Sequence, residues 1–315
     1  PMPPKILVIS GPTASGKTRL AVELALRHGG EVVSADSMQV YRRMDIGTAK
    51  PTPEEMRGIP HHMLDVADPE EDFSVARYVE LAAPCVDDIL ARGKLPIVAG
   101  GTGLYLDSLL SGRTFAPFSP DGGLRARLEA RFDALGGGAM LGELAAADPE
   151  AAARLHPNDR KRIVRALEVF QQTGKTISQH NRETRALSPR YDALTLSLAF
   201  QRREDMWARI DRRVDEMMAA GLAEEVRALL DSGVPVRCTA MQAIGYKEMA
   251  AALRGGGDVC AAAEEIKLRS RQYAKRQLTW FRRTEGAKWL FWGPEPDFEA
   301  ACRTSTKYLE EFGLV

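Results

Sequence analysis

A chain of 315 residues is long enough for one large domain, or for one domain that carries an insertion. Its 44% hydrophobic and 27% charged residues are typical of an ordinary globular protein. The 43 Lys and Arg residues balance the 43 Asp and Glu residues, which excludes an overall field that draws the chain to nucleic acid, although a local basic face can be hidden in a neutral sum.

The four cysteines are scattered and include no Cys-x-x-Cys pair. This spacing argues against a disulfide framework or a zinc module and favours a reducing compartment. No apolar run approaches the length of a membrane span, and the first ten residues lack a charged-then-apolar leader. We therefore expect a cytoplasmic protein with no membrane partner.

The N-terminal part alternates between predicted strands and helices. KILVIS, at 5–10, is an apolar and β-branched run that predicts a buried strand. A helical stripe follows the glycine-rich stretch 11–18 and stops at Gly29. Residues 31–37 and 94–101 are predicted as further strands with a helix-like stretch between them. This alternation predicts an α/β fold, a P-loop-type parallel sheet flanked by helices.

From about Ala116 the pattern changes to helical periodicity without a strand signal. We expect Asp159 to cap a helix that runs to Gln172, and Gly174 to stop it.

Strand patterns return at 193–200 and 288–292. We therefore expect one α/β core from residues 1–115 and 193–315. An all-helical insertion domain at 116–192 would interrupt it.

The stretch GPTASGKT lies between the first strand and the first helix, and its Gly11, Gly16, Lys17 and Thr18 fill the pattern of a phosphate-binding loop. Backbone N–H groups of such a curve point inward, and the following helix adds its positive end. Lys17 supplies a charge, and the Thr18 hydroxyl suits Mg²⁺, the expected cofactor. The predicted phosphate-binding residues are Gly11, Thr13, Ala14, Ser15, Gly16, Lys17 and Thr18.

The loop alone does not say which phosphate it holds. An ATPase of this class needs an apolar strand that ends in Asp, but PIVAGG ends in Gly100 and Gly101. Only Asp36 closes a strand near the loop, where it could hold the metal or act as a base on an acceptor. A P-loop kinase of a small metabolite or nucleotide stays open at this point.

Seven stretches along the chain change that interpretation, and in order they are GPTASGKT, SADSMQVYRRMDIGTAKP, HHMLD, GGTGLYL, HPNDRKRIVRALE, QAIGYKE and AKRQLTWFRR. Together they run from about residue 6 to 284 and resemble the tRNA dimethylallyltransferase family. Without paired cysteines for a zinc finger, the resemblance is to the bacterial form. It implies transfer of a dimethylallyl group from dimethylallyl diphosphate to N6 of adenine 37, beside the tRNA anticodon, with release of diphosphate.

The resemblance implies a role for each of four residues. Asp36 would be the base for the weakly nucleophilic adenine amine, or else a metal-linked or capping carboxylate. Arg213 would clamp the diphosphate, and with Arg209 it could instead form a solvated helix face. Thr102 would touch the acceptor, or else cap the next helix. Thr18 would carry the Mg²⁺ that stabilises the diphosphate.

The resemblance also implies a set of residues that contact the anticodon stem-loop. Among them Gln39 would read the edge of the extruded adenine, and Tyr246 would offer a stacking face unless it is ordinary packing. The set is Asp36, Ser37, Met38, Gln39, Thr102, Arg125, Lys161, Arg162, Ile163, Val164, Arg165, Gln242, Ala243, Ile244, Gly245, Tyr246 and Lys247. Basic residues on the insertion helix and at 264–283 favour a phosphate-backbone surface.

Other interpretations stay open. A non-catalytic tRNA-binding protein could use the loop as an anion site, and a related branch of the family prenylates free adenine nucleotides. Trp280 and Phe281 are predicted to be core residues, and His61 and His62 structural contacts rather than metal ligands, because adjacent residues rarely point at one ion. We expect a monomer.

Overall fold

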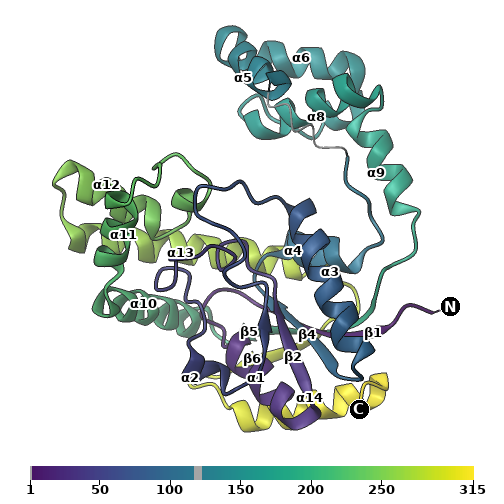
Figure 1. Cartoon of the computed structure of the whole chain (residues 1–315), viewed down its shortest axis with the longest axis vertical. Helices are drawn as coiled ribbons and strands as arrows, with labels where there is room; N and C mark the ends of the chain where they lie inside the picture. The colour runs from purple at the N-terminus through teal and green to yellow at the C-terminus, as the bar shows by residue number, and fades with distance from the viewer. Residues whose placement is uncertain (1, 117–122) are drawn as a thin grey trace. The chain divides into compact units, whose positions relative to one another are not determined.

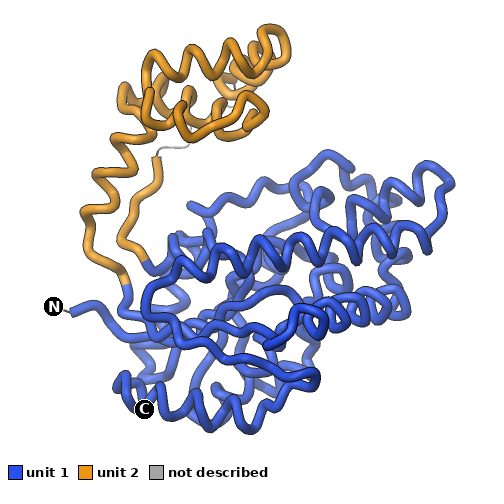
Figure 2. The backbone as a smooth tube through the Cα atoms, turned by 180° about the vertical axis from the view of Figure 1, so that it is seen from behind, with its two compact units in different colours: residues 1–110, 191–315 blue, residues 111–190 orange. Residues whose placement is uncertain are grey.

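The structure, a computed structural model, describes residues 2–116 and 123–315. Two compact units make up the chain (Figure 2). The core unit consists of Pro1–Leu110 and Tyr191–Val315, and the helical unit of Ser111–Arg190. The insertion expected at 116–192 overlaps the helical unit, and its limits differ from the observed ones by a few residues at each end.

A six-stranded sheet with the order β3-β2-β4-β1-β5-β6 lies at the centre of the core unit (Figure 1). Every neighbouring pair is parallel. The strands are β1 (Lys5–Ser10), β2 (Gly30–Ser34), β3 (His61–His62), β4 (Leu95–Gly100), β5 (Asp192–Phe200) and β6 (Lys288–Trp292). The predicted α/β fold is therefore confirmed. The pattern missed β3, because two residues are too few to show a periodicity.

Helices cover both faces of the sheet. The helix α1 (Lys17–His28) leads from β1 past β4 to β2, whereas α3 (Val75–Ala91) leads from β3 past β2 to β4, in the opposite direction. Because such crossovers are right-handed, opposite directions place the two helices on opposite faces. The helix α4 (Gly103–Leu110) packs beside α3, and α14 (Phe298–Phe312) packs beside α1. Burial on both faces is why the inner strands β1 and β4 are mostly apolar.

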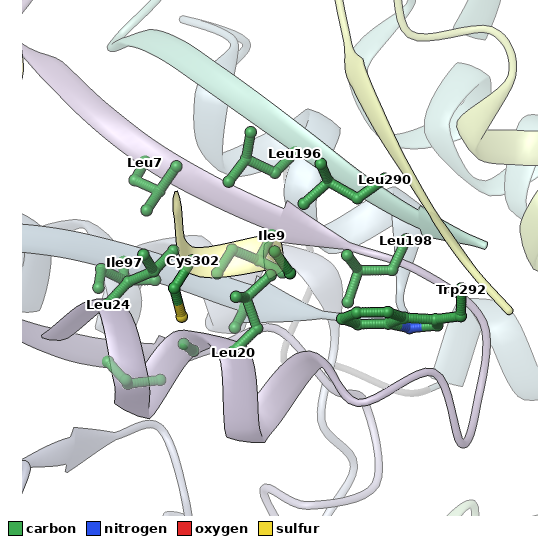
Figure 3. Close-up of a cluster of buried hydrophobic side chains, with 14 of the residues drawn as sticks. Leu7, Ile9, Leu20, Leu24, Ile97, Leu196, Leu198, Leu290, Trp292 and Cys302 are labelled. Atoms are coloured by element: carbon green, nitrogen blue, oxygen red, sulfur yellow. The ribbon is translucent and has the colours of Figure 1, made fainter. Parts of the chain in front are cut away.

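The α1 face carries the main apolar core, shown in Figure 3. It contains Leu7, Ile9, Leu20, Leu24, Ile97, Leu196, Leu198, Leu290, Trp292 and Cys302. Trp292, the last residue of β6, also makes a hydrogen bond, in which its indole Nε1 donates to the Ser15 carbonyl at 2.7 Å. The core therefore anchors the glycine-rich loop directly.

The rest of the core unit is a group of helices that pack against one another: α10 (Arg203–Ala220), α11 (Leu222–Asp231), α12 (Tyr246–Gly255) and α13 (Val259–Phe281). A short helix, α2 (Pro53–Met56), and a 3₁₀ turn, η1 (Ala240–Gln242), lie in the connections. The helix α13 also contacts α4, so it reaches the end of the sheet where α4 begins. Among the described helices, none combines the length and the apolar character that a bilayer crossing needs.

The helical unit has a core of its own, formed by apolar residues of α5 (Gly123–Leu135), α6 (Gly137–Ala147) and α8 (Arg160–Thr173). Two shorter helices, α7 (Pro149–Ala152) and α9 (Ile177–Arg185), complete it. Gly174 ends α8 in the left-handed conformation, as expected. Asp159 occupies the N-cap position of α8, as expected, but its carboxylate accepts the His156 N–H and makes no capping bond to the helix.

A buried carboxylate ties β2 to the end of α3. Glu31, only 3% exposed, pairs with Arg92 at 2.6 Å, His62 at 2.9 Å and Lys94 at 3.4 Å. The hydrogen bonds from Arg92, above all, lower the pKa of Glu31 to about 2. The partner of His62 supports the structural role expected for that residue.

We predict that Glu31→Gln lowers the free energy of unfolding by about 1–3 kcal/mol at pH 7. The folded pKa of Glu31 lies below its ordinary value of 4.5, so this stabilisation is complete above that value and is lost as the pH falls towards 2. Urea unfolding of both proteins between pH 7 and pH 3 should show the difference shrinking. The exposed Glu204, 3.9 Å from Arg202, provides the control Glu204→Gln, with an effect below about 0.5 kcal/mol. A difference that is independent of pH contradicts the prediction.

Candidate active site

Three turns meet at the carboxyl ends of the neighbouring strands β2, β4 and β1. The Thr102 Oγ1 accepts the Ser37 N–H at 3.0 Å, and the Thr102 N–H donates to the Ala35 carbonyl at 3.2 Å. A Cβ on Gly100 would lie 2.1 Å from the Ala35 carbonyl oxygen, so only glycine allows this approach. The glycine pair that ends β4 therefore brings the Thr102 turn against the Asp36 turn.

The glycine-rich loop has the geometry of an anion site. Ala14 and Gly16 have φ values of 61° and 81°, in the left-handed region, and curl the chain into the N-terminus of α1. No acidic residue and no side-chain cap lies at that end of α1, so its positive end stays available for phosphate. The buried Ser15 Oγ has no hydrogen-bond partner among the described residues. A phosphate oxygen would supply one.

The Thr13 amide departs from the expectation that all loop amides face the phosphates. Its N–H donates to Gln277 Oε1 of α13 at 2.9 Å. Gln277 lies in the stretch AKRQLTWFRR, but no role was predicted for it. A pattern of consecutive residues does not show which distant side chain will bond to a given loop amide.

Lys17 is a half-buried cation that loses its proton more readily than an exposed lysine. Its Nζ donates to the Pro12 carbonyl at 2.8 Å. Burial lowers the pKa of Lys17 to about 7; Asp36 opposes this shift, and the positive charge of Arg213 adds to it. Burial also lowers the pKa of Arg213, which the negative charges of Glu55, Glu216 and Asp36 partly offset. Of the two arginines considered from sequence, Arg213 is thus the one that interacts electrostatically with Lys17 and with Asp36, and an anion between the two cations would stabilise both.

Asp36 lies two residues beyond the end of β2, in the turn rather than in the predicted strand. Its Oδ1 accepts the backbone N–H groups of Met38 at 2.8 Å and Gln39 at 3.1 Å. No hydrogen bond to Oδ2 is present in the described part of the chain. One oxygen of Asp36 therefore fixes the turn, and the other can accept a proton. The residues that follow Asp36 form a turn and not a helix, so Asp36 does not cap a helix.

Thr102 is connected to both sides of the site. Its hydroxyl bonds to the Asp36 turn, as described, and not to the amides of α4, so its side chain does not cap that helix. The Tyr273 side chain of α13 lies close to Thr102 and Gln277, and burial raises the pKa of Tyr273 to about 12. Tyr273 was not predicted as a site residue.

Two of the expected tRNA contacts in the core unit make hydrogen bonds within the protein itself. Gln39 Nε2 donates to the Thr48 and Ala49 carbonyls, and its Oε1 accepts from Ser34, so its amide is used within its own loop. Tyr246 is 0% exposed and donates to Glu225, which leaves no ring face for a base.

Glu225 organises the loop beside Tyr246. Its carboxylate accepts the backbone N–H groups of Asp45 at 2.8 Å and Ile46 at 2.7 Å. A Cβ on Gly47 would lie 2.5 Å from the Tyr246 ring. Tyr246 is therefore a packing residue of a buried network. In the same stretch Ala243 and Gly245 are also buried and Ile244 is half-buried, whereas Gln242 and Lys247 are exposed.

The residues expected to contact tRNA from the helical unit divide by helix face. Ile163 and Val164 are buried in the unit's core, whereas Lys161 and Arg162 are exposed. The buried Glu168 holds Arg125 at 2.7 Å and Arg165 at 2.8 Å. Consecutive residues of a helix cannot all contact the tRNA, because only part of the helix circumference is exposed.

The basic cluster at 264–283 is partly neutralised. Lys267 pairs with Asp215, Arg269 with Glu265, and Arg271 with Asp211. Lys275, Arg276, Arg282 and Arg283 have no carboxylate partner among the described residues, so the basic face is confined to the C-terminal part of α13. Phe281 is buried as predicted, whereas Trp280 is half-buried and donates to Asp107 at 2.9 Å.

The surroundings of Thr18 fit a magnesium ion held chiefly by a diphosphate. Thr18, Ser34, Gln39 and His61 line a small cavity of about 20 Å³. The His61 Nε2 is buried without a hydrogen-bond partner among the described residues, and these residues contain no cluster of three or more acidic, His or Cys side chains suited to a metal. Mg²⁺ commonly keeps several waters and takes its other ligands from phosphates and one or two protein oxygens. A single hydroxyl, from Thr18, matches that manner of binding.

The fold and the loop define a P-loop α/β protein, and known proteins refine this class. The chain matches the family described as IPP transferase over residues 39–284 and that described as isopentenyl transferase over residues 4–71. The tRNA dimethylallyltransferase of Acetivibrio thermocellus is 45% identical over 309 residues, 98% of either chain. That of Geobacter sulfurreducens is 50% identical over 286 residues, 91% of either chain.

Solved structures agree. The full-length tRNA isopentenylpyrophosphate transferase from Bacillus halodurans superposes with a TM-score of 0.72 at 42% identity, covering 98% of this chain and 96% of that one. A eukaryotic dimethylallyltransferase acting on tRNA gives a TM-score of 0.83 at 30% identity, covering 97% and 78%. The chain belongs to the tRNA dimethylallyltransferase (IPP transferase) family, as the seven stretches predicted.

We predict that diphosphate binding is linked to protonation of Lys17. At pH 8 a side chain with a pKa of about 7 is mostly neutral, and a bound anion raises that pKa, so the site takes up close to one proton. At pH 6 Lys17 is already charged and uptake falls towards zero. Calorimetric titration with inorganic diphosphate, in buffers of different ionisation enthalpy, measures this difference.

Lys17→Arg is the matched control, because arginine stays charged at both pH values. It should remove the pH-dependent part of the uptake while retaining diphosphate binding. Equal uptake by both proteins at pH 8 contradicts the assignment to Lys17.

For Tyr246 we predict that Tyr246→Phe lowers the free energy of unfolding by about 1–3 kcal/mol, because Glu225 loses a buried donor. A residue that serves only as a stacking face would tolerate this change, since phenylalanine keeps the ring. Thermal unfolding and a tRNA-binding titration separate the two roles. Tyr308→Phe is the control, and an unchanged stability of Tyr246→Phe relative to it contradicts the buried network.

Proposed function

We propose that this protein transfers the dimethylallyl group from dimethylallyl diphosphate to N6 of adenine 37 in tRNA, giving N6-isopentenyladenine and diphosphate. The observation that carries the proposal is the meeting of three turns at one sheet edge. They bring a phosphate loop, two cations and a carboxylate together. Relatives of nearly the same length are tRNA dimethylallyltransferases, which supports tRNA over a free nucleotide as acceptor.

The donor side stabilises the leaving group. As the bond between the allylic carbon and the diphosphate oxygen breaks, negative charge develops on the diphosphate. Lys17, Arg213 and the N-terminus of α1 are the positive groups placed to meet it. Mg²⁺ at Thr18 would add a further positive charge to the diphosphate.

The acceptor side removes a proton from the adenine N6 amine. The adenine N6 lone pair is delocalised, so the amine becomes acidic only as its bond to carbon forms. Asp36 then takes the proton on the oxygen that does not fix its turn, and a strong base is not needed for this step. Because N6 cannot be reached while the base is stacked, the adenine must leave the anticodon loop to enter the site. Thr102 orients the Asp36 turn and lies beside the incoming base.

All of these groups belong to the core unit of one chain, so we propose that a monomer is sufficient. A tRNA acceptor also agrees with a cytoplasmic enzyme. The exposed Lys161, Arg162, Gln242 and Lys247 are the expected tRNA contacts whose side chains the structure leaves at the surface. They would act mainly on the phosphate backbone.

One assay separates this function from the alternatives. The protein is incubated with Mg²⁺, unmodified tRNA and labelled dimethylallyl diphosphate, and label in the RNA is measured. A parallel reaction with γ-labelled ATP and candidate small acceptors tests the kinase. Transfer of label to RNA supports the proposal. Phosphate transfer from ATP, or tRNA binding without any transfer, overturns it.

Asp36→Asn should reduce turnover by roughly a hundredfold or more, because the amide cannot accept the proton at pH 7. Its carbonyl oxygen can still accept the Met38 and Gln39 amides, so the turn is retained. Single-turnover rates and tRNA affinity are measured on the same preparation. An equal loss of rate and of tRNA affinity would sink the assignment of Asp36 as the base.

A further inference from the structure

One buried amide joins the two sides of the site. Gln277 lies on α13 and is 6% exposed. Its Oε1 accepts the Thr13 N–H at 2.9 Å, and its Nε2 donates to the Gly101 carbonyl at 3.0 Å. Thr13 belongs to the phosphate loop after β1, and Gly101 to the turn after β4. A single side chain of a third element thus holds both turns.

The chemistry of the two partners fixes the orientation of this amide. The Thr13 N–H can only donate and the Gly101 carbonyl can only accept, so the Gln277 side chain must present one acceptor and one donor. The approach is also tight, because a Cβ on Gly101 would lie 2.4 Å from Gln277 Nε2. A side chain at 101 would therefore displace the Gln277 amide from this bridge, whereas a side chain at 100 would meet the Ala35 backbone.

The contacts of this bridge extend to the turn that carries Asp36. Thr102 follows Gly101 directly, and its hydroxyl holds the Ser37 amide beside Asp36. Tyr273, one turn before Gln277 on α13, lies close to Thr102 and Gln277. The two hydrogen bonds of Gln277, the peptide link from Gly101 to Thr102 and the hydrogen bond of the Thr102 hydroxyl therefore connect the phosphate loop to the Asp36 turn.

We propose that Gln277 is a positioning residue that fixes the phosphate loop relative to the Asp36 turn, and so aligns the allylic carbon with the adenine amine. This inference rests on the proposed function. Gln277 need not touch either substrate. Its effect falls on the geometry of the reacting atoms, where an error of about 1 Å can reduce the rate on the order of a hundredfold.

Gln277→Met tests the bridge with a side chain of similar length that has neither a strong donor nor a strong acceptor. We expect kcat to fall by roughly tenfold to a hundredfold, while the KM for dimethylallyl diphosphate and the affinity for tRNA change by less than about threefold. Gln272→Met is the matched control, because Gln272 lies on the same helix with its side chain exposed, and it should behave as wild type.

Gln277→Glu adds a rescue that a purely structural role does not predict. The introduced carboxylate can accept the Thr13 N–H, but it repels the Gly101 carbonyl. Once protonated, the carboxyl group both accepts and donates, as the amide does. Burial beside a carbonyl raises the pKa of such a group, so the activity of this variant relative to wild type should rise as the pH falls from 8 to 6.

The Thr13 amide gives a readout that does not depend on catalysis. Its hydrogen exchange should be at least about tenfold faster in Gln277→Met than in wild type, because the N–H loses its buried partner. A wild-type protein that transfers no label to tRNA overturns the proposed function, and the exchange rate still decides whether the bridge exists.

Three results overturn the inference itself. They are a kcat of Gln277→Met within about twofold of wild type, an activity loss that only follows the folded fraction, and a relative activity of Gln277→Glu that stays flat or falls as the pH is lowered.

Discussion

The position of β1 between β4 and β5 is the constraint on which the rest of the structure depends. A strand buried on both faces and on both edges has a fixed carboxyl end, so the loop that follows it starts from a fixed point. Its neighbours on one side are β4 and then β2, and their turns carry Thr102 and Asp36. From β1 the chain continues to β2 on one side, whereas β5 pairs with β1 on the other side. A change of side of this kind gives a parallel sheet the type of crevice where α/β proteins bind ligands.

Two elements from the C-terminal part of the chain stabilise this edge. Trp292 holds the Ser15 carbonyl from the α1 face, and Gln277 holds the Thr13 amide from α13. Both bonds are to backbone groups of the phosphate loop, one to an acceptor and one to a donor. The loop is thus braced before any anion arrives, which lowers the ordering cost of binding. The anion in turn relieves the repulsion between Lys17 and Arg213, which are two half-buried cations. Asp36 lies near both of them, and Glu55 and Glu216 lie near Arg213.

Local patterns were sufficient to predict the fold and the part of the site that follows the strands. KILVIS predicted β1 with its observed limits, and GPTASGKT predicted the loop, because both signals depend on consecutive residues. The two-residue β3 and the end of β2 at Ser34 were not predicted, since no periodicity marks them. Tyr246, Ile163 and Val164 were expected at the tRNA surface, but burial depends on tertiary packing that a motif does not encode. Gln277 and Tyr273 were missed for the same reason, as their partners lie more than a hundred residues away.

The absence of an acid at the end of β4 has a chemical meaning in this arrangement. A phosphoryl-transfer enzyme needs a carboxylate there to hold Mg²⁺ while a nucleophile attacks phosphorus. When the nucleophile attacks carbon instead, the diphosphate only departs, and the loop and its cations are sufficient to receive it. The carboxylate is then useful on the acceptor side, and Asp36 supplies it from the neighbouring turn. Gly100 and Gly101 allow the Asp36 turn to lie close to the phosphate loop. A side chain at either position would separate the donor side of the site from the acceptor side.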